Sequence, residues 1–182
     1  MKMTNKKLSI IRRDLIGFIF QDYSLLDNMT ILDNIVLPAM ESKKTSESKK
    51  EKTKRGEDLM RKLDIIEVAD NDINEVSGGQ LQRACICRSM INKPKVLFAD
   101  EPTGALNRTA SNEVMKELVK LNEEGTTIMM VTHDAKVAAK CSRVLYIVDG
   151  NIKGEYNSPK EKDVQEKDRE RMLNNWLMEL GW

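Results

Sequence analysis

The sequence has almost no histidine and no pair of cysteines spaced for metal binding. His133 is the only histidine, and the three cysteines, which include no C-x-x-C pair, are Cys85, Cys87 and Cys141. Structural zinc sites take about four Cys or His ligands, so the sequence predicts no zinc site. So few cysteines provide no disulfide framework either, and we expect the protein to work in a reducing cytoplasm.

Long apolar runs and an excess of one charge are also absent. Runs such as VLFA and IGFIF are far shorter than the roughly 20 residues that span a bilayer. The N-terminal MKMTNKKLSIIRRD lacks the apolar core and cleavage site of a signal peptide. The net charge is only +1, so we expect no basic surface for nucleic acid. The 182 residues are 40% hydrophobic, which is enough for one globular domain with a buried core.

Short apolar runs alternate with stretches of helical periodicity along the chain. Buried strands are predicted at residues 15–20, 96–100 and 126–134. Helices are predicted at residues 56–70, 81–91 and 109–122, with a short one ending near Cys141. Residues 25–40 show mixed apolar periodicity, with a helix start near Asp33 and its end near Pro38. Strands that alternate with helices indicate an α/β domain with a largely parallel sheet.

Three further segments have recognisable patterns. RVLYIVDGNI, residues 143–152, predicts a hairpin with an Asp-Gly turn. Residues 41–55 are polar and rich in lysine, which fits a loop, a solvated helix, or both in succession. The charged tail after residue 155 ends in an amphipathic stripe, which either docks on its own domain or forms a partner surface; the stripe is Met172, Leu173, Trp176, Leu177 and Leu180.

Carboxylates follow one of the predicted strands directly. In VLFADEP, Asp100 and Glu101 come at the end of an apolar run, and ligands bind at this edge of open α/β sheets. One acid of such a pair can hold a divalent metal and the other can polarise a water. An acidic turn is the plainer alternative. His133, at the end of the next predicted strand in VTHD, is expected at the same edge.

The stretch NEVSGGQLQR has the features of an anion-binding helix start. Ser77 and Gln80 form a capping-box pattern, and Gly78 and Gly79 allow a ligand to approach the backbone. The N–H groups of a helix N-terminus attract anions without a cationic side chain. The alternative is a capped helix after a glycine turn, with no ligand.

Taken together, the motifs resemble those of the ATP-binding subunits of ABC transporters. In order along the chain, GFIFQD is similar to the Q-loop, VSGGQLQR to the signature motif, VLFADEP to Walker B, GALN to the D-loop and VTHD to the switch region. The resemblance extends from about residue 16 to residue 152. SLLDNMTILDNIVLPA and ADEPTGAL are similar to the subgroup that serves lipoprotein release, macrolide export and antimicrobial-peptide resistance. The resemblance implies a P-loop NTPase-like parallel sheet with an α-helical subdomain.

The resemblance also implies roles for single residues. Gln21 and Asp100 would serve magnesium, Glu101 would be the catalytic base, and His133 would contact the γ-phosphate of ATP. The signature residues would bind ATP held by a second subunit in a head-to-tail dimer; these are Ser77, Gly78, Gly79 and Gln80. The D-loop would comprise Gly104, Ala105, Leu106 and Asn107. A membrane permease would be the other partner, and the expected location is the cytoplasmic face of the membrane.

The chain departs from the family pattern in several places. Val76 stands where leucine is usual and Leu81 where a polar residue is common, and Asn107 replaces the usual aspartate of the D-loop. More importantly, the sequence contains no G-x-x-x-x-G-K-[ST], because none of its nine glycines is followed by lysine. We therefore expect a cassette truncated at its N-terminus, before the Q-loop, and at best a weak ATPase.

These patterns lead to one prediction of domains and function. Residues 1–154 would form an ABC ATPase domain without Walker A, with a helical subdomain at about residues 24–93, and residues 155–182 a tail. The function would be that of an ATP-binding, ATP-hydrolysing subunit of an ABC exporter. Alternatives are a non-catalytic regulatory or interaction protein, or a chain without a stable fold. An ABC ATPase of DNA repair or translation fits less well.

Overall fold

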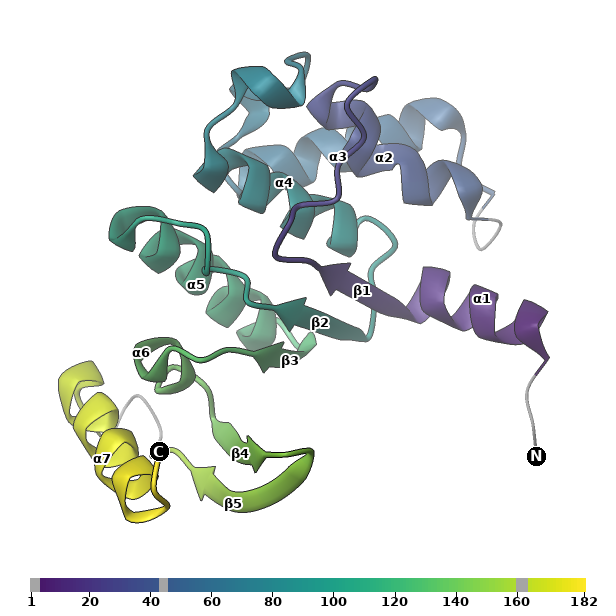
Figure 1. Ribbon diagram of the computed structural model, residues 1–182. Coiled ribbons are helices and arrows are strands. Elements are labelled where there is room, and N and C mark those ends of the chain that lie inside the picture. The colour runs from purple at the N-terminus through teal and green to yellow at the C-terminus, as the bar shows by residue number, and fades with distance from the viewer. Residues whose placement is uncertain (1–3, 43–45, 160–163) are drawn as a thin grey trace. The chain divides into compact units, whose positions relative to one another are not determined.

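The computed structural model describes residues 4–42, 46–159 and 164–182 and divides into two units (Figure 1). The first unit is Met1–Val131 and the second is Thr132–Trp182. Among the described residues, no helix is both long and apolar enough to cross a bilayer.

The first unit contains a parallel sheet of three strands. These are β1 (Ile16–Ile19), β2 (Val96–Asp100) and β3 (Thr127–Val131), in the order β1-β2-β3. Helix α5 (Arg108–Glu123) joins β2 to β3, as a parallel connection requires. The predicted α/β fold with a parallel sheet is therefore confirmed. The sequence did not predict α1 (Asn5–Leu15), which takes Leu15 out of the expected first strand.

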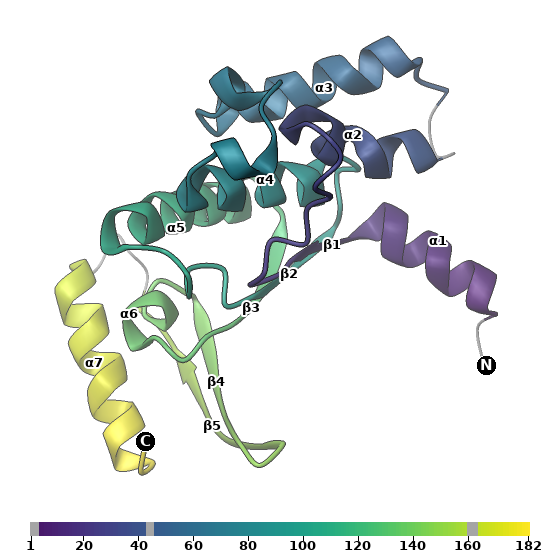
Figure 2. The same cartoon turned by 45° about the horizontal axis from the view of Figure 1, so that its top comes forward.

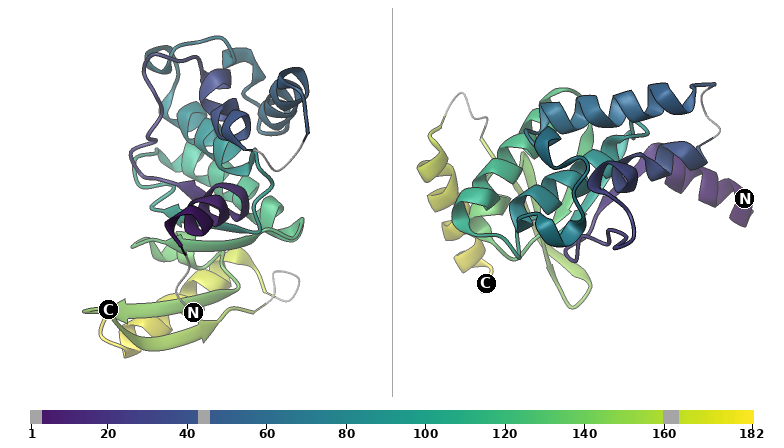
Figure 3. Two further views of the ribbon diagram at one scale, coloured as in Figure 1. Left: turned by 90° about the vertical axis from the view of Figure 1, so that its right-hand side faces the viewer. Right: turned by 90° about the horizontal axis from the view of Figure 1, so that it is seen from above.

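Between β1 and β2 the chain forms a group of helices, drawn in blue and dark teal in Figures 1 and 3. Its elements are α2 (Ile31–Glu41), α3 (Lys49–Lys62), the 3₁₀ turns Ile66–Val68 and Ile73–Glu75, and α4 (Gly78–Met90). Their mutual core is fully buried and includes Ile31, Ile35, Met60, Ile65 and Ile86. These elements fall within the range predicted for the helical subdomain.

Local interactions explain the start of one predicted helix and the wrong bounds of another, the one predicted at residues 56–70. Helix α2 begins at Ile31, close to the start predicted near Asp33, because Thr30 caps it by accepting a hydrogen bond from the Asp33 amide. Helix α3 ends at Lys62, because Asp64 adopts a left-handed φ of 53° and turns the chain into a 3₁₀ segment. The lysine-rich segment is helical from Lys49, with a capping box at Ser48, whereas residues 43–45 lie outside the described residues.

The two faces of the sheet differ in how far helices bury them. Leu97 and Ala99 point to the face that α4 and α5 cover, and both are buried (Figure 2). On the other face Phe18 stacks on Phe98, and their strand neighbour Met129 is 53% exposed. The prediction that residues 126–134 form a fully buried strand is therefore wrong, because β3 lies at the sheet edge and helices cover only one of its faces.

The second unit is built on an antiparallel hairpin. Strands β4 (Arg143–Val148) and β5 (Asn151–Asn157) are joined by Asp149 and Gly150, which both have positive φ. This is the backbone of the tight hairpin turns that favour Asp-Gly, so the predicted hairpin is confirmed. The short helix α6 (Ala135–Ala138) precedes it, three residues before Cys141.

The C-terminal helix α7 (Glu166–Glu179) packs on this hairpin. Leu173 and Leu177 are buried against Val144, Tyr146 and Tyr156. The rings of Tyr156 and Trp176 lie 5.4 Å apart. Of the two alternatives for the amphipathic tail, the structure therefore has the one in which the tail docks on its own chain.

Strand β1 approaches α4 so closely that only glycine fits at position 17. A Cβ on Gly17 would lie 2.7 Å from the Ser89 carbonyl oxygen, which belongs to α4 and cannot move away by a rotamer change. Gly17→Ala is therefore expected to lower the free energy of unfolding by about 1–3 kcal/mol, measured by urea denaturation. Lys95→Ala, an exposed side chain beside the same strands, is the control, with a change within about 0.5 kcal/mol. Equal midpoints for Gly17→Ala and the unaltered chain would contradict the close packing.

Candidate functional site

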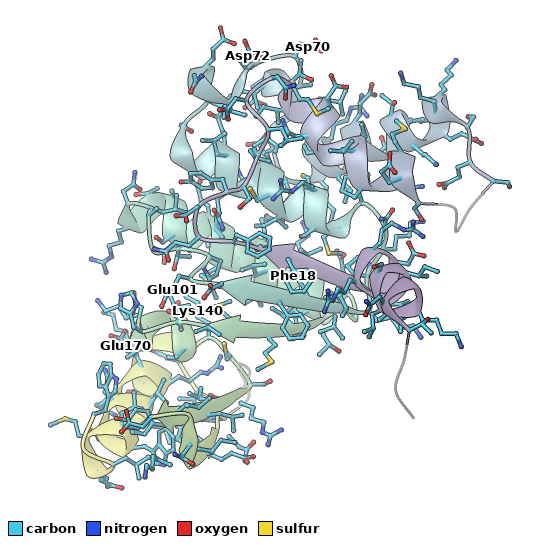
Figure 4. All side chains as sticks on the ribbon, turned by 45° about the vertical axis from the view of Figure 1, so that its right-hand side comes forward. Phe18, Asp70, Asp72, Glu101, Lys140 and Glu170 are labelled. Carbon is cyan, nitrogen blue, oxygen red and sulfur yellow. The ribbon has the colours of Figure 1, made fainter. Side chains whose placement is uncertain are left out.

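Two acidic residues, Asp100 and Glu101, lie at the carboxyl end of strand β2. Asp100 is its last residue and is exposed. Glu101, labelled in Figure 4, follows with a left-handed φ of 44°. Its backbone N–H donates to the Val131 carbonyl at 3.0 Å, which extends the β2–β3 ladder by one residue. A left-handed non-glycine residue is uncommon, and such residues concentrate at functional sites.

Gln21, Glu101 and Gly104 lie together at this edge. The Gly104 N–H donates to the Glu101 carbonyl oxygen at 3.0 Å. A Cβ on Gly104 would lie 3.4 Å from the Glu101 Cβ and 3.6 Å from the Gln21 Nε2. The structure thus brings together three residues that the sequence analysis took from three different motifs.

The SGGQ stretch forms the predicted capped helix start. Ser77 is the N-cap of α4: its Oγ accepts from the Gln80 amide at 3.4 Å, and the Gln80 Oε1 accepts from the Ser77 amide at 3.1 Å. Gly78 and Gly79 occupy the first turn, where N–H groups have no partner inside the helix. This arrangement can hold an anion through backbone N–H groups and the helix dipole.

Packing is a second reason for the two glycines. A Cβ on Gly78 would lie 3.1 Å from the Tyr23 hydroxyl, and one on Gly79 would lie 3.2 Å from the Ala110 Cβ in α5. The alternative of a packed glycine turn is therefore supported as well, and it is compatible with anion binding. Sequence reasoning missed Tyr23, although its position two residues after Gln21 was a signal of proximity to the site.

The segment Gly104–Asn107 connects the acids to α5. The Leu106 amide donates to the Thr103 carbonyl at 3.1 Å, and the Leu106 side chain would be 3.7 Å from a Cβ on Gly78. Ala105 is exposed. Asn107 is the N-cap of α5, and its Oδ1 accepts from the Ala110 amide at 3.0 Å. Asn107 therefore performs the capping task for which asparagine and aspartate are equally suited.

His133 belongs to the second unit. Its side chain is exposed and stands between two residues with local hydrogen bonds. The Asp134 amide donates to the Thr132 hydroxyl at 3.1 Å, and Asp134 caps α6 through the Lys136 amide. The grouping within the first unit thus comprises Gln21, the acids and the glycine segments, and the place of His133 in the site stays a prediction.

The donor set favours a cation that is held jointly with a ligand. In the described part of the chain, no three His, Cys, Asp or Glu side chains form a cluster that could bind a metal by themselves. Magnesium commonly takes one or two carboxylates together with phosphate oxygens and water. The Asp100 carboxylate and the Gln21 amide offer oxygen donors of this kind, and their use in holding magnesium stays a prediction.

Two replacements of Asn107 test its role as the N-cap of α5. Asn107→Ala removes the side-chain acceptor, so we expect a loss of about 1 kcal/mol in the free energy of unfolding. Asn107→Asp keeps the acceptor and adds a charge that the helix dipole favours, so stability is expected to stay equal or rise by up to about 1 kcal/mol. Urea denaturation of both variants tests this. A loss with Asn107→Asp as large as that with Asn107→Ala would contradict the capping role.

Comparison with known proteins extends these observations. The sequence profile of the family described as "ABC transporter" matches residues 2–104. The bacitracin export ATP-binding protein BceA of Halalkalibacterium halodurans is 43% identical over 152 residues, which are 83% of this chain and 59% of that protein. The macrolide export ATP-binding/permease protein MacB of Campylobacter jejuni is 41% identical over 166 residues, which are 91% of this chain and 25% of that protein. This chain therefore spans less than two thirds of the length of either relative.

Solved structures agree with the sequence relatives. The dimeric structure of MJ0796, a bacterial ABC transporter cassette, is similar with a TM-score of 0.77 and 38% identity, over 85% of this chain and 68% of that one. A post-hydrolysis dimer of the same cassette, bound to ADP and Pi, gives a TM-score of 0.78 and 36% identity. The profile covers more than half of the sequence and the fold agrees with it. This chain belongs to the ABC transporter family and is similar to its ATP-binding subunits.

Proposed function

We propose that this chain is the ATP-binding component of an ABC exporter and that it supplies the signature half of a composite nucleotide site. The observation that carries the proposal is the first turn of α4. There Ser77 caps the helix, and Gly78 and Gly79 leave the backbone N–H groups uncovered by any Cβ of their own. The two export relatives described above support the exporter assignment.

The residues at the sheet edge fit the roles that the resemblance implies. Glu101 would take the proton of an attacking water, and Asp100 with Gln21 would hold the metal. His133 would hydrogen-bond to phosphate once ATP is bound. ATP with Mg²⁺ would supply the transferable phosphoryl group and neutralise part of its charge. Gly104 keeps the space between Glu101 and Gln21 open, since any side chain there would meet both.

The 182 residues contain no lysine-bearing phosphate loop. Phosphoryl transfer depends mostly on positioning and charge stabilisation of the phosphates. A chain with the SGGQ end of α4 and without that loop can contact a nucleotide that another subunit holds. Dimerisation with a second ATPase subunit, association with a membrane permease and a place at the cytoplasmic membrane face complete the proposal. The second candidate is a non-catalytic regulatory or interaction protein, which would offer the SGGQ turn of α4 to a complete cassette.

Association with a complete cassette tests the half-site. The 182-residue chain is mixed with a family cassette that has the phosphate loop and whose catalytic glutamate is replaced by glutamine. We expect a complex in light scattering only with ATP and Mg²⁺. Gly79→Glu should weaken this complex by about tenfold or more, because the carboxylate would repel phosphate at the helix N-terminus.

Asn74→Glu is the matched control for that experiment. It adds the same charge at an exposed position in the 3₁₀ turn Ile73–Glu75, before the cap of α4. The control should associate as the unaltered chain does. Association that does not need ATP, or that Gly79→Glu leaves unchanged, would contradict the half-site.

Turnover by the chain alone tests the consequence of the missing loop. The ATP hydrolysis rate of the 182-residue chain is expected to equal that of its Glu101→Gln variant, because the phosphates lack their main holders. Phosphate release at saturating Mg²⁺ measures both rates, with circular dichroism to show that the two chains are equally folded. A rate that falls clearly on Glu101→Gln would mean that this chain alone forms a working site.

A further inference from the structure

Two consecutive residues after Gln21 adopt a conformation that L-amino acids avoid. Tyr23 has a φ of 57° and Ser24 a φ of 50°, although neither is glycine. In this region the Cβ crowds the backbone, so each residue raises the free energy of the folded chain. Such a pair persists only where surrounding contacts hold it.

Helix α4 provides those contacts from Cys85, in its middle, and from Arg88, in its last turn. One terminal nitrogen of Arg88 donates to the Tyr23 carbonyl at 2.7 Å, and the other donates to the Ser24 carbonyl. The Cys85 thiol also donates to the Tyr23 carbonyl, at 3.1 Å. Burial raises the pKa of this thiol to about 11, so it keeps the proton that it donates at neutral pH.

The Tyr23 side chain reaches the other end of the same helix. Its hydroxyl would be 3.1 Å from a Cβ on Gly78, in the first turn of α4. Burial raises the pKa of the phenol above its ordinary value. Tyr23 therefore contacts α4 at the SGGQ end through its ring and near Arg88 through its carbonyl.

The other end of the segment Tyr23–Leu26 is held by a different residue. Asn34 of α2, which is only 1% exposed, accepts from the Leu26 amide at 2.7 Å and donates to the Leu26 carbonyl at 3.1 Å. Asn34 and Arg88 thus act on separate parts of the segment, and loss of one should leave the bonds of the other in place.

We propose that Arg88 is a positioning residue, which holds Tyr23 and Ser24 in the left-handed conformation and thereby sets Gln21 relative to the SGGQ end of α4. Arginine suits this task because its planar fork serves two carbonyl oxygens at once, whereas lysine offers a single point of charge. The use of Gln21 in a nucleotide site rests on the proposed function. The clamp itself, which is the pair of hydrogen bonds from Arg88 to the Tyr23 and Ser24 carbonyls, does not depend on that function.

Amide hydrogen exchange of the 182-residue chain, followed residue by residue by NMR without nucleotide, tests the clamp. In Arg88→Gln the Ser24 amide is expected to exchange about tenfold faster or more, because local opening no longer breaks two charged hydrogen bonds. The Leu26 amide should keep its rate, since Asn34 still holds it. Arg88→Lys should give an intermediate rate for Ser24.

Arg83→Gln is the matched control. Arg83 lies in the same helix and pairs with Glu113 of α5, so its loss should leave the Ser24 amide unchanged. An unchanged Ser24 rate in Arg88→Gln would overturn the proposal. Equal acceleration in Arg83→Gln, or loss of protection throughout the unit in both Arg88 variants, would also overturn it, because Arg88 would then act on general stability.

A second measurement detects the stored strain directly. Ser24→Gly removes the crowded Cβ, so it should raise the urea midpoint of the unaltered chain. In an Arg88→Lys or Arg88→Gln background the segment can relax, and Ser24→Gly should raise the midpoint by clearly less. Equal shifts in all backgrounds would show that Arg88 does not maintain the conformation, and would overturn the proposal. Neither measurement involves ATP, so their outcome is independent of the nucleotide site.

Discussion

The close packing of helix α4 against β1 and the segment after it is the constraint on which the site depends. Gly17 lets the backbone of β1 approach Ser89, and the middle of α4 is buried through Ala84, Cys85 and Ile86. With the helix held in this way, its first turn is carried to the carboxyl edge of the sheet. A side chain at position 17 would push α4 away from β1 and would separate the SGGQ turn from Tyr23 and Leu106.

That placement explains how a helix start becomes part of a larger site. Gly78 meets Tyr23 and Leu106, which come from the segments after β1 and β2. Glu101, just after β2, lies beside Gln21 at Gly104, where an added Cβ would be within 3.6 Å of both. Residues from three separate stretches of the chain therefore share one edge, as the crossover connections of a parallel sheet allow. An anion at this edge would be held by the backbone N–H groups of the first turn of α4, and a cation would have to offset the charge of the nearby acids.

The apolar runs show where sequence patterns and structure diverge. The pattern of β3 is continuous and apolar, which is typical of a strand buried on both faces. In the structure Met129 and Val131 are more than half exposed, because the sheet ends at β3 and helices cover one face. Burial is decided by what packs on a strand, which the residues of the strand do not encode. The left-handed φ values of Tyr23 and Glu101 were likewise invisible in the sequence, since both residue types usually have negative φ.

By itself the sequence determined the alternation of strands and helices, the hairpin at Asp149–Gly150 and the capping box at Ser77, because each depends on residues only a few positions apart. It also determined the family, through motifs that occur in a set order. Tertiary structure alone decided that Gln21, Glu101 and Gly104 meet, that α7 docks on β4 and β5, and that Arg88 reaches two carbonyl groups 64 and 65 positions away. Those outcomes depend on how helices pack on a sheet, and packing brings together residues whose separation along the chain has no regular pattern.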